Sequence, residues 1–276
     1  MGIKFTKMHG LGNDFMVIDA INQKINLKPK KIESLARRDT GIGFDQCLLI
    51  EKSNQDNIDF FYRIFNSNGE EVGQCGNGAR CIARFINHYG MSKKNTIRVA
   101  TITTQMELLL NKDDSVTVEM GKPKLYPTDI PIAAIKEEVI YELPLVNQKP
   151  CKIHALSIGN PHAIMLVSNI ASINVNELGK EISLHSFFPE KSNVSFMQII
   201  NKNHISLRVY ERGAGETKAC GSAATAAAIA GMLFHNLDDN ITVSLPGGDL
   251  LVTWPKLEGS VFLKGPATFV YEGRLI

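Results

Sequence analysis

The sequence has little net charge, no long apolar run and no leader-like start, and each absence excludes a class of protein. Thirty basic and 28 acidic residues leave a net charge of +2 over 276 residues, which argues against binding to nucleic acid or to an acidic membrane surface. No apolar run approaches the roughly 20 residues of a membrane-spanning helix. The first 14 residues lack the apolar core of a signal peptide. We therefore expect a cytoplasmic protein without a nucleic-acid or membrane partner.

Motifs for metals and cofactors are also missing. The chain has no Cys-x-x-Cys and no pair of histidines at metal-ligand spacing, which argues against a structural zinc site. It has no glycine-rich dinucleotide fingerprint, no P-loop and no recognisable pyridoxal-phosphate site. We expect a protein that needs neither a metal nor a cofactor.

The five cysteines are too few and too widely spaced for a disulfide framework. Their number is odd, and they stand at Cys47, Cys75, Cys81, Cys151 and Cys220. Cys47 starts an apolar run, Cys81 lies inside a predicted helix and Cys151 opens a predicted strand, so these three are interpreted as small buried apolar residues. Cys75 and Cys220 have a different setting, described below.

Strand patterns outnumber helix patterns, which indicates an α+β protein. Predicted strands include 60–65, 116–120, 153–158, 194–200, 205–210 and 250–254, and predicted helices cover 29–38, 78–89 and 221–234. The last helix is small and apolar on every face, so we expect it to be buried all round. The stretch 122–150, rich in proline and mixed charge, is interpreted as a connection between two halves.

A weak repeat relates the two halves of the chain. Four positions recur in the same order at an offset that drifts only from 147 to 145: Asn13 with Asn160, Gln46 with Asn193, Asn66 with Glu211, and Cys75 with Cys220. Each cysteine follows a glutamate by four positions, Glu71 and Glu216, which are interpreted as loop charges. Each cysteine also precedes a glycine, a small polar residue and a helix.

The repeat predicts two pseudo-symmetric domains. Each is expected to be a mixed, barrel-like β-sheet wrapped around a central helix, with the active site in the cleft between them. The first domain would comprise residues 1–121 plus a C-terminal strand at 266–276, and the second residues 122–265.

The matched cysteines point to proton transfer. A helix start offers backbone N–H groups without intrahelical partners and a partial positive charge. There a cysteine can ionise more easily, and a carboxylate can bind the same N–H groups. If the two helix starts face each other, one sulfur can remove the hydrogen next to a bound carboxylate while the other protonates the opposite face. Cys75 and Cys220 are therefore our candidate acid–base pair.

Four stretches carry further motifs: KMHGLGNDF at 7–15, FNSNGEEVGQCGNGARC at 65–81, GNPH at 159–162 and ERGAGETKACGSAAT at 211–225. Together they resemble the signature stretches of the diaminopimelate epimerase family. The resemblance implies interconversion of LL- and meso-2,6-diaminopimelate, in the synthesis of lysine and peptidoglycan precursors, by a cofactor-independent isomerase. It also implies that Cys75 and Cys220 are the two bases and that the enzyme is a homodimer.

The resemblance assigns further roles residue by residue. His162 and Glu211 match groups that tune the pKa values of the cysteines, and Tyr271 matches a tyrosine at the dimer contact. Ser222 departs from the threonine common in the family but keeps a hydroxyl. The positions that match substrate-binding residues are Asn13, Gln46, Asn66, Gly76, Asn77, Asn160, Asn193, Glu211, Arg212, Gly221 and Ser222.

General chemistry supports some of these roles independently. Arg212 can clasp a remote carboxylate with its planar guanidinium, and asparagine amides both donate and accept hydrogen bonds. The competing interpretation of Asn13 and Asn160 is turn formation, and that of His162 is a structural histidine.

The sequence is also compatible with three alternative functions. A proline or hydroxyproline racemase could use the same pair of bases, although a substrate with one carboxylate would not need Arg212 and so many amides. A thiol redox protein could cycle Cys75 and Cys220 through a disulfide. An amino-acid-binding protein could merely bury both cysteines.

Overall fold

The chain folds into two compact units in a computed structural model that describes residues 2–73, 75–146 and 149–276. Unit 1 comprises Met1–Glu119 and Lys264–Ile276, and unit 2 comprises Met120–Leu263. The domain boundaries predicted from the sequence lie two residues further along the chain and remain a prediction, as does the location of the active site. Gln74, which precedes Cys75 in its motif, lies outside the described residues.

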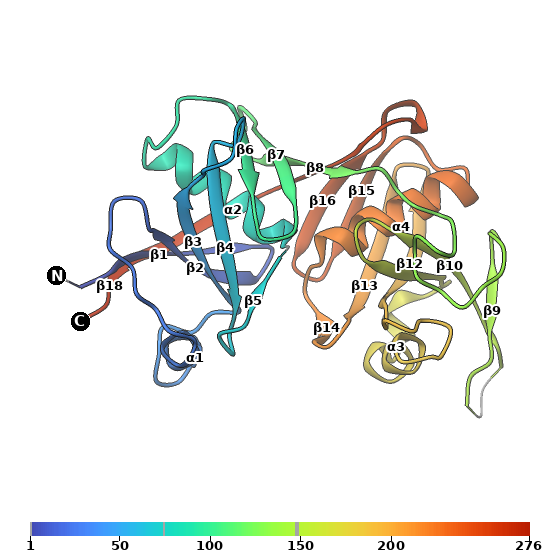
Figure 1. Cartoon of the computed structure of the whole chain (residues 1–276). Helices are drawn as coiled ribbons and strands as arrows, with labels where there is room; N and C mark the ends of the chain where they lie inside the picture. The colour runs from blue at the N-terminus through green and yellow to red at the C-terminus, as the bar shows by residue number, and fades with distance from the viewer. Residues whose placement is uncertain (1, 74, 147–148) are drawn as a thin grey trace. The chain divides into compact units, whose positions relative to one another are not determined.

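Unit 1 contains two helices and has most of its strands in its N-terminal segment (Figure 1). Its elements are β1 (Lys4–Gly10), β2 (Asn13–Asp19), α1 (Pro29–Ala36), β3 (Gln46–Lys52), β4 (Phe60–Asn66), β5 (Glu71–Val72), α2 (Gly76–His88), β6 (Thr96–Ala100), β7 (Gln105–Leu110), β8 (Val116–Gly121) and β18 (Thr268–Arg274). The C-terminal strand β18 pairs antiparallel with β1.

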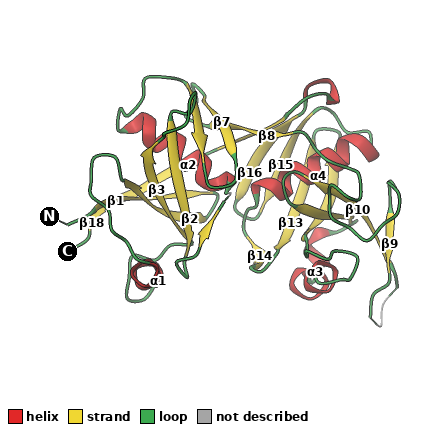
Figure 2. Ribbon diagram, in the orientation of Figure 1, coloured by secondary structure: helices red, strands yellow, loops and turns green. Residues whose placement is uncertain are grey.

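Unit 2 contains the other two α-helices of the described chain, drawn red among yellow strands in Figure 2. Its elements are β9 (Tyr141–Leu143), β10 (Cys151–Ser157), β11 (Pro161–Leu166), α3 (Val175–Ser183), β12 (Asn193–Asn201), β13 (His204–Glu211), β14 (Gly215–Thr217), α4 (Gly221–Phe234), β15 (Asn240–Leu245), β16 (Gly248–Thr253) and β17 (Val261–Gly265). Short 3₁₀ turns cover Ile170–Ser172 and Pro255–Leu257.

The two units repeat one order of strand pairings. In unit 1, β1–β2, β3–β4, β4–β5 and β6–β7 are antiparallel, whereas β2–β3 and β4–β6 are parallel. In unit 2, β10–β11, β12–β13, β13–β14 and β15–β16 are antiparallel, whereas β11–β12 and β13–β15 are parallel. The weak sequence repeat is thus a repeat of structure.

A helix lies at the centre of each mixed sheet, as the sequence predicted. In unit 1, α2 contacts β1, β2, β3 and β7, and in unit 2, α4 contacts β10 to β13, β15 and β16. All of α4 from Gly221 to Met232 is buried except Ser222. Alanine and glycine dominate this helix because strands approach it from several sides and leave little room for side chains. The α+β fold with a central helix in each half is confirmed.

Two features of unit 2 differ from the sequence prediction. The stretch 122–150 is more than a connection, because Ile130, Ile132, Tyr141 and Leu143 are buried in the core of this unit. Helix α3 was not predicted, since it is short and has a glycine, Gly179, in its middle. A Cβ at that position would lie 2.4 Å from the Tyr210 side chain. The glycine therefore allows α3 to pack closely against β13.

Candidate active site

Cys75 is the N-cap residue of α2, as the motif predicted. Its backbone is extended, with φ −154° and ψ 107°, and its sulfur accepts a hydrogen bond of 3.3 Å from the Gly78 amide. The side chain is half-buried. An N–H donor and the positive end of the helix both favour the thiolate over the thiol. The local structure therefore suits Cys75 to act as a base.

Two predicted substrate-binding amides lie against this cysteine. The Cys75 sulfur is 3.8 Å from Asn13 Oδ1, and the same oxygen accepts a 3.2 Å hydrogen bond from Asn77 Nδ2. Asn13 Nδ2 in turn donates to Asp45 Oδ2 over 2.9 Å. Asn13 is the first residue of β2, and its substrate-binding role stays a prediction.

Gln46 and Asn66 stand side by side at the ends of neighbouring strands. They are paired across the antiparallel β3–β4 ladder, and Gln46 Nε2 donates to Asn66 Oδ1 over 2.9 Å. Gln46 Oε1 is buried and has no hydrogen-bond partner among the described residues. Buried polar atoms are rarely left unpaired. This oxygen is therefore a candidate contact for the substrate.

Cys220 is the N-cap residue of α4 and occupies the matching place in unit 2. Its backbone is also extended, with φ −131° and ψ 114°, and its sulfur lies 3.5 Å from Ser222 Oγ. Burial raises the pKa of the Cys220 thiol, and the Glu211 carboxylate raises it further. The Ser222 hydroxyl and the Ala223 amide act in the opposite direction but are outweighed. Cys220 is therefore held as a neutral thiol.

Glu211 is kept near Cys220 by its place at the end of β13. Its carboxylate accepts a short hydrogen bond from the Thr217 hydroxyl on β14, the strand that pairs with β13. Glu211 thus contributes to the raised pKa of Cys220, and the tuning role that the resemblance implied stays a prediction. Thr217 was not singled out from the sequence, because nothing in its local pattern marks a residue that orients a carboxylate.

His162 is fully buried and neutral. Burial, and after it the positive charge of Arg212, lowers its pKa from 6.5 to about 3. The ring nitrogen Nε2 lies 2.9 Å from Asn160 Oδ1. Because an amide oxygen can only accept, Nε2 donates and Nδ1 is left as an acceptor. Nδ1 is buried without a partner in the described part of the chain.

Asn193 holds the backbone of Arg212 through a hydrogen bond. Its Oδ1 accepts the Arg212 backbone N–H over 2.9 Å, and the Arg212 guanidinium donates to the Glu190 carbonyl over 2.9 Å. His162 and Asn193 are neighbours in the parallel β11–β12 ladder. The equivalent neighbours in unit 1 are Phe15 and Gln46. The two units thus share this strand register, which holds one predicted polar residue in unit 1 and two in unit 2.

The two glutamates interpreted as loop charges have a different role. Glu71 lies on β5 and accepts hydrogen bonds of 2.8 and 2.7 Å from Arg63 on β4. Glu216 lies on β14 and accepts bonds of 2.7 and 3.0 Å from Arg208 on β13. Both pairs join the strands that lead toward a cysteine, so the glutamates are structural. The arginines share the 145-residue offset of the cysteines, a signal that the sequence contained.

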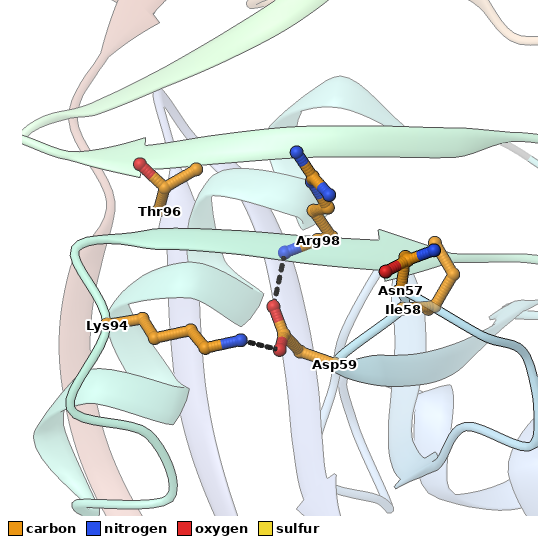
Figure 3. Close-up of a pocket in the computed structure, with 6 residues that line it drawn as sticks. All are labelled: Asn57, Ile58, Asp59, Lys94, Thr96 and Arg98. Atoms are coloured by element: carbon orange, nitrogen blue, oxygen red, sulfur yellow. Dashed lines mark hydrogen bonds and ion pairs between the residues drawn. The ribbon is translucent and has the colours of Figure 1, made fainter.

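A polar hollow of about 340 Å³ elsewhere in unit 1 contains none of the predicted site residues (Figure 3). Asp59 there accepts hydrogen bonds from Lys94 Nζ at 2.5 Å and from the Arg98 amide at 2.9 Å. Burial raises the pKa of Asp59, but these two partners outweigh it and leave the pKa lowered. Asp59 is thus already paired with Lys94. The hollow is therefore a weaker candidate for the active site than the surroundings of the two cysteines.

The described residues lack two further features. No helix among them is both long and apolar enough to cross a membrane. No group of three or more histidine, cysteine, aspartate or glutamate side chains in the same residues could hold a metal ion.

Comparison with known proteins decides the family. The model of the diaminopimelate epimerase family matches residues 5–126 and 154–270. The chain is 60% identical to the diaminopimelate epimerase of Legionella pneumophila strain Paris over 276 residues, covering all of both chains. It is 59% identical, with the same coverage, to that of strain Philadelphia 1. The chain belongs to the diaminopimelate epimerase family.

Solved structures with low sequence identity share the fold of this diaminopimelate epimerase family member. A hydroxyproline epimerase from Agrobacterium vitis is 12% identical, with a TM-score of 0.70 over 99% of this chain and 92% of the other. A phenazine biosynthesis protein of the PhzF family from Bacillus anthracis is 15% identical, with a TM-score of 0.67 over 100% and 99%. At such identities the likeness concerns the fold alone.

Replacing Glu211 should make Cys220 more reactive. A negative charge near a thiol raises its pKa, so Glu211→Gln should lower the pKa of Cys220 and shift its pH profile of alkylation toward lower pH. The check is the rate of iodoacetamide labelling of Cys220 against pH, followed by mass spectrometry. Glu258→Gln, at an exposed position, is the control. A Cys220 profile that stays in place, or moves to higher pH, contradicts the assigned role of Glu211.

Proposed function

We propose that the protein interconverts LL- and meso-2,6-diaminopimelate without a cofactor, as an isomerase of lysine and peptidoglycan precursor synthesis. Membership of the diaminopimelate epimerase family over the whole chain supports this substrate. The observation that carries the proposal is the placement of Cys75 and Cys220 as N-cap residues of the central helix in each unit.

In the proposed reaction the two sulfurs act on opposite faces of one carbon. A thiolate removes the α-hydrogen as a proton, and the electron pair passes to the adjacent carboxylate. The other cysteine, a thiol, then delivers its proton to the opposite face of the carbon. The centre is inverted, and the two cysteines end the turnover with their protonation states exchanged. The reverse reaction uses the same residues in exchanged roles.

The proposal assigns a protonation state to each cysteine in the enzyme before substrate binds. Cys75 accepts the Gly78 N–H and is half-buried, which supports a thiolate. Burial and Glu211 raise the pKa of Cys220, which supports a thiol. In the free enzyme Cys75 is then the base and Cys220 is the acid. This pair of protonation states can convert only one of the two isomers. After one turnover the protonation states are exchanged, and the enzyme can convert the opposite isomer.

The helix starts would also bind the reacting carboxylate. Negative charge grows on that carboxylate as the α-proton leaves, and N–H donors fixed in place stabilise such charge without reorganising. Loss of one such donor typically costs about 10²–10³-fold in rate. The residues proposed to supply donors here are Gly76 and Asn77 on α2, and Gly221 and Ser222 on α4.

The remaining predicted residues would recognise the distal amino-acid group of the substrate. Gln46 Oε1, a buried atom lacking a partner among the described residues, can accept a hydrogen bond from an ammonium group. His162 keeps its proposed role of tuning the pKa values of the cysteines. Arg212 would bind the distal carboxylate. The other proposed contacts are Asn13, Asn66, Asn160, Asn193 and Glu211.

Deuterium incorporation tests the reaction. With LL-diaminopimelate in D₂O, the wild-type enzyme should give meso product with deuterium at the inverted carbon, measured by NMR. Cys75→Ala and Cys220→Ala should each abolish inversion, because each removes one proton carrier. Cys151→Ala, which changes a buried thiol outside the site, should retain activity. Proline serves as a substrate control and should not be racemised. Inverted product without solvent deuterium is incompatible with two exchangeable bases.

We also infer a cytoplasmic homodimer, by resemblance to the family. Tyr271 on β18 is 45% exposed and packs edge-on against Phe5, with ring centroids 6.1 Å apart. Sedimentation should therefore give twice the 30.5 kDa of one chain, and Tyr271→Ala should weaken association. Tyr126→Ala, at a tyrosine that is 62% exposed, is the matched control. A wild-type protein that sediments as a monomer at micromolar concentration contradicts the dimer.

A further inference from the structure

Arg80, on the second turn of α2, is a buried positive charge that the mechanism above does not use. Its side chain is completely buried and is the largest of the fully buried side chains in the described chain. No ion pair to a carboxylate is found for it among the described residues. Its Nη1 has no hydrogen-bond partner there either. A buried charge without a carboxylate is costly, so its presence calls for a function.

The guanidinium starts a chain of hydrogen bonds that ends at Cys75. Arg80 Nη2 donates to Asn77 Oδ1 over 2.8 Å. This bond fixes which end of the Asn77 amide is the oxygen, and so directs Asn77 Nδ2 to Asn13 Oδ1 at 3.2 Å. Asn13 Oδ1 is the atom that faces the Cys75 sulfur at 3.8 Å. Rotation of either amide would break a bond in this chain.

Two other contacts hold Arg80 in this position. Its Nε donates to the Pro266 carbonyl over 3.1 Å, which ties α2 to the segment that precedes β18. Gly10, paired with Asn13 across β1–β2, leaves the space that the guanidinium and Asn77 fill. A Cβ at Gly10 would lie 3.2 Å from Arg80 Nη2 and 3.3 Å from Asn77 Cβ. The surroundings are thus shaped around the Arg80–Asn77 pair.

The positive charge of Arg80 interacts electrostatically with the sulfurs of Cys81 and Cys75. Burial lowers the pKa of Arg80, whereas negative charge on Cys81 or Cys75 raises it. Burial raises the pKa of Cys81 to a value that keeps it a thiol at neutral pH. Cys75, with its N–H donor from Gly78, is then the sulfur that can ionise near the guanidinium.

Other titratable groups on the surrounding elements do not compensate Arg80. Lys7 on β1 and Asp14 on β2 form an ion pair of 2.6 Å with each other. Glu107 on β7 pairs with Arg98. Burial keeps Cys47 on β3 and Tyr62 on β4 protonated by raising the pKa of each.

We propose that Arg80 is a positioning residue for Cys75: its buried guanidinium fixes the Asn77–Asn13 amide pair against the sulfur and supplies positive charge that favours the thiolate. The proposal rests on the role of Cys75 in the proposed function. Asn13 Oδ1 alone would favour the thiol, because it can accept an S–H. That donor is weak, whereas a buried full charge acts strongly over several ångströms. The charge of Arg80 therefore dominates.

The test compares Arg80→Gln, Arg80→Lys and the control Arg84→Gln. Arg84 lies one turn further along α2 and bonds to the Asp114 carbonyl at 2.6 Å. The pH profile of Cys75 alkylation is measured by mass spectrometry, with Cys220 in the same molecule as an internal reference. Arg80→Gln should shift the Cys75 profile to higher pH by about 1 unit or more, because a positive neighbour is lost, and should leave the Cys220 profile in place. Arg84→Gln should change neither profile.

Arg80→Lys separates charge from geometry. It keeps the charge but lacks the planar fork that reaches both Asn77 and Pro266. The Cys75 pH profile should therefore recover toward that of wild type, while kcat stays reduced by about 10²-fold, as for a misplaced catalytic group. Substrate KM should change much less.

Protection of buried Cys81 from the same reagent reports that each variant is folded. If Arg80→Gln does not fold, the kcat and the Cys75 pH profile of Arg80→Lys decide alone whether Arg80 is a positioning residue. A folded Arg80→Gln variant whose Cys75 profile coincides with wild type, or an Arg80→Lys enzyme with unchanged kcat, overturns the proposal. Alkylation needs no substrate, so a wild-type enzyme inactive on diaminopimelate would refute the proposed function and leave the shift measurable.

Discussion

The N-terminal backbone amides of α2 and α4 are the constraint on which the rest of this structure depends. Those amides have no partner inside the helix, and the N-cap residue at each start is a cysteine in extended conformation, of which Cys75 accepts an amide hydrogen bond through its sulfur. A sulfur in that position is placed by the backbone itself. The same amides can bind a carboxylate beside it. In the proposed reaction, geometry and electrostatics therefore come from one local feature, used once in each unit.

The sheets determine what surrounds each sulfur, and the surroundings are unequal. The parallel and antiparallel registers bring Gln46 beside Asn66 in unit 1 and His162 beside Asn193 in unit 2. Cys220 is buried near Glu211, which raises its pKa, whereas Cys75 is half-buried. A repeated fold with unequal surroundings suits a reaction in which one group must be a base while the other is an acid.

Sequence patterns predicted the fold class, the two central helices and the cysteines at their starts, because these depend on local periodicity and on a repeat. They did not predict α3, whose central glycine reflects contact with Tyr210. They also missed the structural bonding of Glu71 and Glu216 to arginines on neighbouring strands. The buried charge of Arg80 was missed too, since its hydrogen-bond network reaches Asn13, 67 positions before it, and Pro266, 186 positions after it. Such contacts exist only after folding.

The proposed reaction requires Cys75 and Cys220 to reach one carbon, and oxidation of the pair tests this requirement most directly. Treatment with diamide, which takes up the two electrons and two protons released by a pair of thiols, should join them in a disulfide. Peptide mapping by mass spectrometry should find the Cys75–Cys220 linkage as activity disappears, and both changes should reverse with dithiothreitol. Loss of activity without that linkage, with each sulfur oxidised separately, would contradict the account.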